Sequence, residues 1–552
     1  MTTTLFHGGT VWLGAARPPA DRLLVRDGRV VALDDEAERL AEAASAEAAG
    51  PVERVDLEGG FLMPAFGDGH AHPLFGGLEA AGPDVRSCSS IPEIVDEVRR
   101  YAEAHPEREW ILGASYDGSL ADEGLFDARW LDEAVADRPV VLRAWDYHTV
   151  WCNTRALELA GIDRDTPEPE LGEIPRRADG SPLGTLREWG AVELVTDIAP
   201  ARPLEERLQA LEAASDYYLA RGVTWVQDAW VEPDDVETYL AAAEADRLRI
   251  RSNLALYADP RRFPRQLPGF LDAHRRVDEL GSPMLTAQTV KFFVDGVIEN
   301  ETGALLEPYC SALHKHGMTV WEPAVLADAV RAVDAAGFQV HLHAIGDAAV
   351  RLALDAIEGA IDANGPRDRR PVIAHAQLVD DADLDRFARL GVIPNMQPLW
   401  AQLDALMTVL TVPRLGDERS ARQYRLRSIE ASGARLAFGS DWPVSSGDPL
   451  EGISVAATRR TPEGDPAGGW VPDEILPVEL ALDAYSSAVA HQAFGDLAAV
   501  PWGEIAPGAS ADLVWLAADP RTVDPGELAA TPVRATWLAG IPHTRGERLP
   551  TP

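Results

Sequence analysis

The chain has 552 residues, 46% hydrophobic and 25% charged, which predicts a folded protein of two or three domains. Its net charge of −39 argues against nucleic acid or an anionic membrane as partner, because both are negatively charged. The three cysteines are scattered and predict no disulfide framework. No signal peptide and no apolar run of about 18 residues is found. We therefore expect a cytoplasmic protein with a small-molecule partner; the sequence does not fix the oligomeric state, and a homodimer is one option.

Short strand-like segments occupy both ends of the chain. Apolar segments at 22–26 and 29–33 flank Asp27-Gly28, which is a hairpin signal. Similar segments at 511–516 and 533–538 lie near the other end. Each end is too short to bury a core alone. Residues 1–60 and 500–552 are therefore predicted to form one composite β-sandwich.

Between the ends, strand-like segments alternate with helical patterns. The predicted strands are an opening run from residue 61, then 222–228, 249–256, 289–295, 338–343, 372–375, 392–396 and 435–441. Eight such β/α units favour a TIM (β/α)8 barrel, here formed by residues 61–75 and 205–499. The gap after the first strand is too long for one connection, so residues 76–204 are predicted to be an insertion domain.

The opening run ends in Asp68-Gly69-His70-Ala71-His72. Alternate side chains of a strand share a face, so His70 and His72 point the same way. Two imidazoles at the end of a strand can bind one metal ion. Alone this is weak evidence, because such pairs more often pack in a core or lie on the surface.

Further metal-competent or metal-assisting residues fall at predicted strand ends, where TIM barrels place their chemistry. With the histidine pair, the set is His70, His72, Lys291, His343, His375 and Asp441. Each has an ordinary alternative, such as a core histidine, a helix cap or a salt-bridged lysine, but six together favour a metal centre. Only Lys291 and Lys315 among the 50 basic residues are lysines, and a primary amine is a group that arginine cannot supply.

The motifs resemble the amidohydrolase superfamily, and within it the YtcJ-like amidohydrolases (amidohydrolase family 3). The resemblance covers nearly the whole chain and is carried by segments 68–72, 291–296, 343–347, 373–377, 439–444 and 508–514. It implies a distorted TIM barrel with a composite β-sandwich built from both termini and a large insertion after the first barrel strand.

The resemblance also implies roles for the six residues. His70 and His72 would bind one metal ion, and the other two histidines would bind a second ion or complete a single site. Asp441 would be both ligand and general base. Lys291 would be a bridging and catalytic residue, carboxylated in many relatives, which requires a neutral amine. His341 is expected to be a core residue or to lie behind the ligands.

Substrate contacts are expected from four residues. His148 lies in segment 147–157, which resembles a family segment that reaches the site, and we expect it to contact the substrate or the oxyanion; a surface-loop histidine is the alternative. Glu188, Trp400 and Trp442 are expected to line the pocket, although aromatic residues at strand ends often serve packing alone.

The expected function is metal-dependent hydrolysis of a C–N bond other than a peptide bond, such as an N-acyl or N-formyl amide. One or two divalent ions, Zn2+ first among them and Fe, Mn or Co as alternatives, would supply hydroxide at neutral pH, and Asp441 would move the proton. Alternatives are a deaminase or esterase reaction at the same site, and a non-catalytic binding or structural protein on the same barrel.

Overall fold

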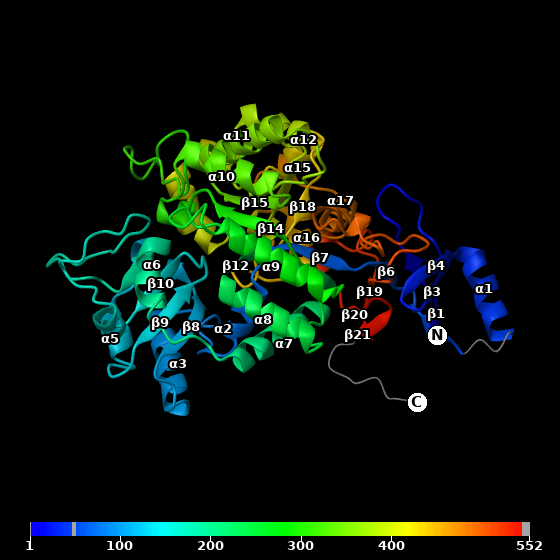
Figure 1. Cartoon of the computed structure of the whole chain (residues 1–552), viewed down its shortest axis with the longest axis horizontal. Coiled ribbons are helices and arrows are strands. Elements are labelled where there is room, and N and C mark those ends of the chain that lie inside the picture. The colour runs from blue at the N-terminus through cyan, green and yellow to red at the C-terminus, as the bar shows by residue number, and fades with distance from the viewer. Residues whose placement is uncertain (1, 47–50, 544–552) are drawn as a thin grey trace.

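A computed structural model describes residues 2–46 and 51–543 of the chain. A central barrel lies between an insertion on one side and small sheets from the two chain ends on the other (Figure 1). The β-sandwich predicted from residues 1–60 and 500–552 includes residues 1, 47–50 and 544–552, which lie outside the described residues. Within those residues, no helix combines the length and the apolar composition needed to cross a membrane.

The barrel is a sheet of eight strands in the order β18-β17-β16-β15-β14-β13-β12-β7, with every neighbouring pair parallel. The strands are β7 (Phe66–Ala71), β12 (Val223–Val231), β13 (Arg251–Tyr257), β14 (Leu285–Phe293), β15 (Gln339–Ala344), β16 (Val372–His375), β17 (Ile393–Met396) and β18 (Ala437–Phe438). All eight predicted strand regions contain a barrel strand. Beyond the short last strand, the N–H of Asp441 donates to the carbonyl of His70 at 2.7 Å, which brings the first and last strands together.

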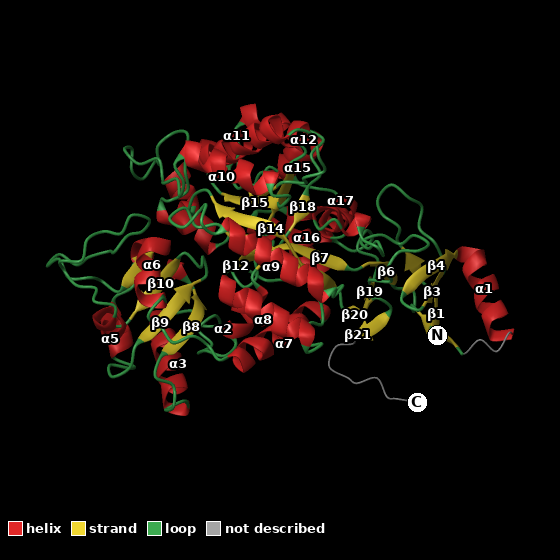
Figure 2. Ribbon diagram, in the orientation of Figure 1, coloured by secondary structure: helices red, strands yellow, loops and turns green. Residues whose placement is uncertain are grey.

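Helices surround the barrel strands (Figure 2). They are α7 (Leu204–Leu219), α8 (Pro233–Glu244), α9 (Leu267–Leu280), α10 (Pro323–Ala335), α11 (Asp347–Asn364), α12 (Leu384–Leu390), α13 (Val412–Leu415), α14 (Asp417–Ser420), α15 (Leu426–Ala431), α16 (Pro449–Thr458), α17 (Val478–Tyr485) and α18 (Ser487–Gln492). The sequence explains α10 well. The Glu322 side chain accepts hydrogen bonds from the first-turn N–H groups, and Leu326, Val330 and Val333 share one buried face.

The opening apolar run is two strands rather than one. β6 (Phe61–Pro64) pairs antiparallel with β19 (Leu513–Leu516) outside the barrel, and only β7 enters the barrel. Between them, the N–H of Ala65 donates to the carbonyl of Asp512 at 2.9 Å. A continuous run of apolar residues cannot show this change of sheet, because both strands are buried.

Two sheets from the chain ends face a shared core. One has the order β4-β3-β1-β5 and the other the order β2-β6-β19-β20-β21. The remaining strands are β1 (Thr3–His7), β2 (Thr10–Val11), β3 (Leu23–Arg26), β4 (Arg29–Leu33), β5 (Val52–Asp56), β20 (Val533–Leu538) and β21 (Ile541–His543). Phe6, Leu23, Leu62, Leu513 and Trp537 pack in one buried cluster, so residues from both ends of the chain build the core. The helix α1 (Asp34–Ala46) covers the first sheet.

The insertion carries its own four-stranded sheet, in the order β11-β10-β9-β8. Its elements are α3 (Ile91–Ala104), β8 (Ile111–Tyr116), α4 (Ala128–Asp132), β9 (Val140–Ala144), β10 (Thr149–Cys152), α5 (Thr154–Leu159), β11 (Thr185–Arg187) and α6 (Trp189–Thr196), and α2 (Pro73–Glu79) joins it to the barrel. Thr149 on β10 lies opposite Arg187 on β11. His148, which precedes β10, and Glu188, which follows β11, therefore lie at the same end of two neighbouring strands.

A buried ion pair joins the terminal sheets to the barrel. The guanidinium of Arg251 on β13 contacts the carboxylate of Asp512, which also accepts from the N–H of Ala539 at 2.7 Å and from the hydroxyl of Ser510 at 2.9 Å. The Asp512 side chain is 2% exposed, so loss of its carboxylate would leave Arg251 without a charge partner in a buried site.

We expect Asp512→Ala to lower the free energy of unfolding by about 3–5 kcal/mol, because one partner of a buried pair is removed. The matched control is Asp216→Ala, which removes the partner of Arg249 in a pair whose side chains are 58% and 43% exposed. That change should cost about 0–1 kcal/mol. Urea denaturation followed by circular dichroism measures both, and equal effects would contradict the prediction.

Candidate active site

Three predicted ligands meet at the ends of the first, sixth and eighth barrel strands. His70, His375 and Asp441 each offer one ligand atom, and these atoms all lie within 4.8 Å of one another. All three side chains are buried. Parallel strands place their carboxyl ends at one mouth of the barrel, which explains why His70 and Asp441, 371 positions apart, converge here.

The Asp441 carboxylate has the surroundings of a metal ligand. Its Oδ1 lies 3.0 Å from Nε2 of His72 and 3.5 Å from Nε2 of His70, yet this buried oxygen has no hydrogen-bond partner of acceptable geometry. The Nδ1 atom of His72 is also buried without a partner. Unpaired buried polar atoms are costly, and imidazole nitrogens around a carboxylate oxygen are a donor set that fits a divalent ion.

Lys291 lies beside this group on β14. Its Nζ is 3.4 Å from Nε2 of His70 and 4.7 Å from the ring centroid of Phe293. Burial lowers the pKa of Lys291 to about 7, against the opposing pull of the Asp441 and Asp228 carboxylates. A neutral amine is therefore accessible near neutral pH, as carboxylation requires.

His70, His343 and His375 are held neutral. Burial lowers the pKa of His70 and His343 well below the usual value and that of His375 to about 3. His343 packs against His375 with ring centroids 4.4 Å apart, and it lies outside the three-atom group. Its Nε2 is 3.1 Å from the carbonyl of Gly296. Because a carbonyl only accepts, this nitrogen carries the proton, and Nδ1 retains the lone pair.

A chain of buried amides fixes the orientation of His375. Gln492 donates to the carbonyl of Gly69 at 2.7 Å and accepts from Asn395 at 2.8 Å. Asn395 in turn accepts from Gln397 at 3.3 Å. The Oε1 atom of Gln397 lies 2.7 Å from Nδ1 of His375. The backbone carbonyl can only accept, so the direction of every bond follows from it. His375 therefore carries its proton on Nδ1 and has a lone pair on Nε2. A Cβ at position 69 would lie 2.1 Å from Nδ2 of Asn395, so only glycine fits there.

Two further residues hold His70 and the end of β7. Nδ1 of His70 is 2.8 Å from Nε2 of the buried His341, which therefore lies behind His70. The carboxylate of Asp68 accepts from the N–H of Ser440 at 2.9 Å and from the Ser440 hydroxyl. This contact ties β7 to the segment that carries Asp441.

The backbone is strained at two of the predicted ligands. The φ angles of His375 and Asp441 are 73° and 56°, in the left-handed region that non-glycine residues seldom adopt. The turn at Asp441 directs its carboxylate into the barrel mouth and sends the next side chain elsewhere. Trp442 stacks on Tyr217, with ring centroids 4.5 Å apart, instead of lining the cavity beside the histidines. The substrate contact predicted for Trp442 stays a prediction, and in the structure its ring packs on Tyr217.

The insertion delivers His148 to the site. Nδ1 of His148 is 2.9 Å from Oε2 of Glu188, whose Oε1 accepts from the hydroxyl of Thr302 at 2.5 Å. Burial lowers the pKa of His148, but the charge and hydrogen bond of Glu188 outweigh it, so the net pKa is raised. The His148 ring centroid lies 5.5 Å from that of His343. Glu188, which was expected to line the pocket, does not line either of the two cavities beside His148 and contacts His148 instead.

Two cavities meet at His148. The first, of about 290 Å³, is lined by His343, His375 and Asp441 together with Trp400, Leu406 and Met407. Trp400 stacks on His375 at 5.5 Å, with the two rings 5° from parallel, as expected for a pocket wall. This cavity is where a substrate can reach the predicted ligands.

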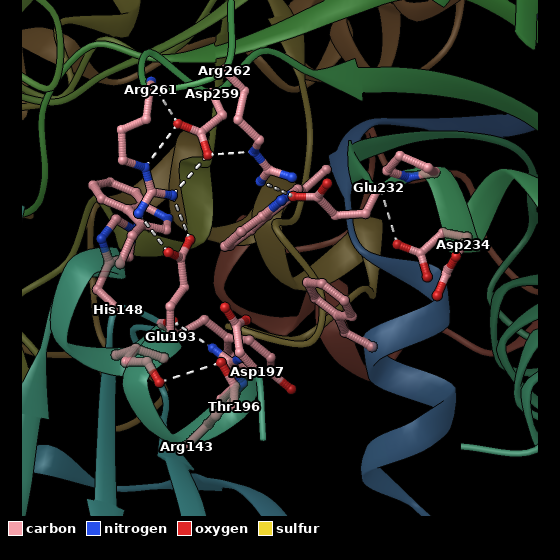
Figure 3. A pocket seen from close by; sticks show the side chains of 17 residues that line it. Arg143, His148, Glu193, Thr196, Asp197, Glu232, Asp234, Asp259, Arg261 and Arg262 are labelled. Atoms are coloured by element: carbon pink, nitrogen blue, oxygen red, sulfur yellow. Dashed lines mark hydrogen bonds and ion pairs between the residues drawn. The ribbon is translucent and has the colours of Figure 1, made fainter. Parts of the chain in front are cut away.

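The second cavity, of about 650 Å³, lies between the insertion and the barrel. Figure 3 shows Arg261 between Glu193 and Asp259, with hydrogen bonds to both carboxylates, and Arg262 reaching toward Glu232. These charged side chains are therefore already paired with one another. The second cavity therefore gives less indication of a ligand than the first.

Several site residues were not predicted. Gln397 directly follows a barrel strand and Asp228 ends the predicted second strand, so their positions were a usable signal. Asp228 is buried, and its Oδ1 lies 3.9 Å from Nδ1 of His72. Asn395 lies within a strand, and Gln492 ends a helix outside the predicted strands. The sequence around these two residues does not distinguish them from asparagine or glutamine residues that are simply buried in a core.

Comparison with known proteins gives a consistent result. A model of the amidohydrolase family matches residues 53–542. Protein LONG AFTER FAR-RED 3 of Arabidopsis thaliana is 32% identical, covering 97% of this chain and 90% of the relative. Putative amidohydrolase YtcJ of Bacillus subtilis is 27% identical, covering 97% and 98%, and N-substituted formamide deformylase of Arthrobacter pascens is 28% identical, covering 95% and 94%.

A solved structure agrees with these relatives. An uncharacterized metal-dependent hydrolase from Pyrococcus furiosus superposes with a TM-score of 0.71 at 26% identity, covering 94% of this chain and all of that one. The chain belongs to the amidohydrolase family of metal-dependent hydrolases.

Proposed function

We propose that the protein hydrolyses a C–N bond other than a peptide bond, in an N-acyl or N-formyl amide. The observation that carries the proposal is the group of His70, His375 and Asp441, with its unpartnered carboxylate oxygen; His375 and Asp441 of this group line a cavity of about 290 Å³. The relative named N-substituted formamide deformylase supports the amide as the bond that is cleaved.

The ligands we propose for one or two divalent ions are His70, His72, Lys291, His343, His375 and Asp441. Zn2+ is the ion that we propose first, because imidazole and carboxylate donors suit it. When bound, such an ion supplies hydroxide at neutral pH and polarises a carbonyl group.

The remaining steps belong to the protein's own side chains. Burial disfavours ionisation of Asp441, but contact with His72 and the nearby positive groups outweigh it and lower the pKa. Ionised Asp441 can take the proton of the attacking water and pass it to the leaving nitrogen. His148, with one nitrogen held by Glu188, can donate its other N–H to the oxygen on which negative charge develops.

We expect protein purified without added metal or chelator to contain one or two divalent ions per chain by elemental analysis. If Lys291 bridges two ions, Lys291→Ala should lower the content toward one or below, whereas Lys315→Ala, which changes an exposed lysine paired with Glu301, should leave it unchanged. A folded parent that holds no metal and takes none up on reconstitution would overturn the proposed function.

Asp441→Asn should reduce kcat on an amide substrate by at least about 100-fold, because the amide cannot accept the proton. The variant should unfold at the same temperature as the parent, since its backbone hydrogen bond to His70 is kept. Steady-state kinetics and thermal unfolding measure the two effects. Parental kcat in the variant would exclude Asp441 as the general base.

Gln397→Leu should weaken metal binding by about 10- to 100-fold, because His375 loses the partner that orients it. Gln288→Leu is the matched control, since its amide donates to the carbonyl of Ala493 instead of an imidazole. Competition with a metallochromic chelator measures the affinity of both variants. Equal affinities would show that the amide chain does not position His375.

A further inference from the structure

The cavity of about 290 Å³ has apolar walls with acceptor groups among them. Val297, Ile345, Leu399, Trp400, Leu406 and Met407 supply most of the wall away from the histidines. Glu299, Gln402 and Asp404 line the same space. This combination is typical of a site for a ligand with an apolar body and a hydrogen-bond-donating end.

Two of the carboxylates that line the cavity, those of Glu299 and Asp404, are not used in ion pairs. Glu299 accepts from the hydroxyl of Thr411 at 2.5 Å through Oε1, and Asp404 accepts from the N–H of Met407 at 2.8 Å through Oδ1. In the described part of the chain, no basic nitrogen lies within 4.0 Å of either carboxylate. Each acid is therefore left without a neutralising cation from the described part of the chain.

Gln402 gives independent evidence of a missing donor. Its residue is 7% exposed, and its Nε2 donates to the carbonyl of Leu399 at 2.8 Å. Because that carbonyl can only accept, the orientation of the amide is fixed. Its Oε1 is then a buried acceptor that no described residue satisfies. A buried acceptor without a partner is costly unless a ligand supplies the donor.

The basic group on the cavity wall is already engaged. Arg86 donates to the two carboxylate oxygens of Glu79 at 2.8 and 3.0 Å and also to the carbonyl of Pro443. His148, the histidine at the junction of the cavities, is paired with Glu188. A substrate carboxylate would therefore meet acids without a free cation to offset their charge.

We propose that this cavity binds a substrate arm that is apolar along its length and ends in a protonated amine, received by Glu299, Asp404 and the free oxygen of Gln402. The inference rests on the proposed function. In the reaction, water adds to the carbonyl carbon, the C–N bond breaks, and the nitrogen leaves as an amine with the proton carried by Asp441. The substrate class is thus a monoacylated diamine, and its products are a carboxylic acid and a diamine.

The test uses the metal-reconstituted full chain and three formamides with the same six-carbon chain. They are N-formylhexylamine, mono-N-formyl-1,6-diaminohexane and N-formyl-6-aminohexanoate. We expect kcat/KM of the amine substrate to exceed that of the neutral one by about tenfold, the effect of one charged contact, with the carboxylate substrate the poorest. Glu299→Gln and Asp404→Asn should each bring the amine-to-neutral ratio closer to one.

Glu301→Gln is the matched control, because Glu301 lies two residues from Glu299 but pairs with Lys315 and does not line the cavity. It should leave the ratio unchanged. Equal rates for all three formamides, or a preference for the carboxylate, would overturn the inference while the hydrolase function stands.

Calorimetry with 1,6-diaminohexane and hexylamine separates the two proposals further. Tighter binding of the diamine, lost in Glu299→Gln, would support the inference even if no formamide is hydrolysed and the proposed function fails. Equal binding of the two amines would overturn it.

Discussion

The site depends on the contact that closes the barrel. The Asp68 carboxylate binds the backbone and hydroxyl of Ser440, and the N–H of Asp441 donates to the carbonyl of His70. These bonds join the first and last strands where a two-residue β18 offers almost no ladder of its own. They also fix the positions of the His70 imidazole and the Asp441 carboxylate relative to each other. If these hydrogen bonds were lost, the His70 imidazole and the Asp441 carboxylate could move apart. One set of hydrogen bonds therefore maintains both the closure of the barrel and the geometry of the predicted metal site.

Burial then sets the chemistry of the groups that closure brings together. The same loss of solvation lowers the pKa of Lys291 and of the histidines, which leaves lone pairs on nitrogen instead of positive charges. The surrounding protein selects which nitrogen holds the lone pair, through the amide chain for His375 and the Gly296 carbonyl for His343. A set of neutral nitrogens around one carboxylate is unfavourable on its own. It becomes favourable when a cation binds. The lack of a hydrogen-bond partner for the buried Oδ1 of Asp441 is therefore an argument for a metal site.

The sequence predicted the barrel well because each strand is a short apolar run and parallel strands end at one mouth. From that rule alone, His70, His375 and Asp441 could be assigned to one place. The split between β6 and β7 could not be seen, because both halves are equally apolar. Trp442 was expected in an apolar pocket wall as an aromatic residue at a strand end, and a sequence could not show the left-handed turn at Asp441 after which its ring packs on Tyr217. The far end of the amide chain behind His375 escaped prediction for a different reason: Gln492 lies 423 residues beyond Gly69, and only the folded chain brings them into contact.

The predicted metal ligands and the residues proposed to select the substrate lie on different parts of the fold. The predicted ligands lie on barrel strands whose positions are fixed by ladders and closure, whereas much of the cavity wall comes from segments after β14 and β17 and from the insertion. Glu299, Gln402 and Asp404 all lie on these connecting segments. Substitutions in these segments can change which substrate arm is accepted without moving a metal-binding residue. The reason is that the connections carry side chains into the cavity but contribute little to the stability of the barrel. His148 lies between the two sets, because it reaches the predicted ligands from the insertion and lines both cavities. If the proposed roles hold, a change at His148 alters substrate binding and catalysis together, whereas a change at Glu299 alters substrate binding alone.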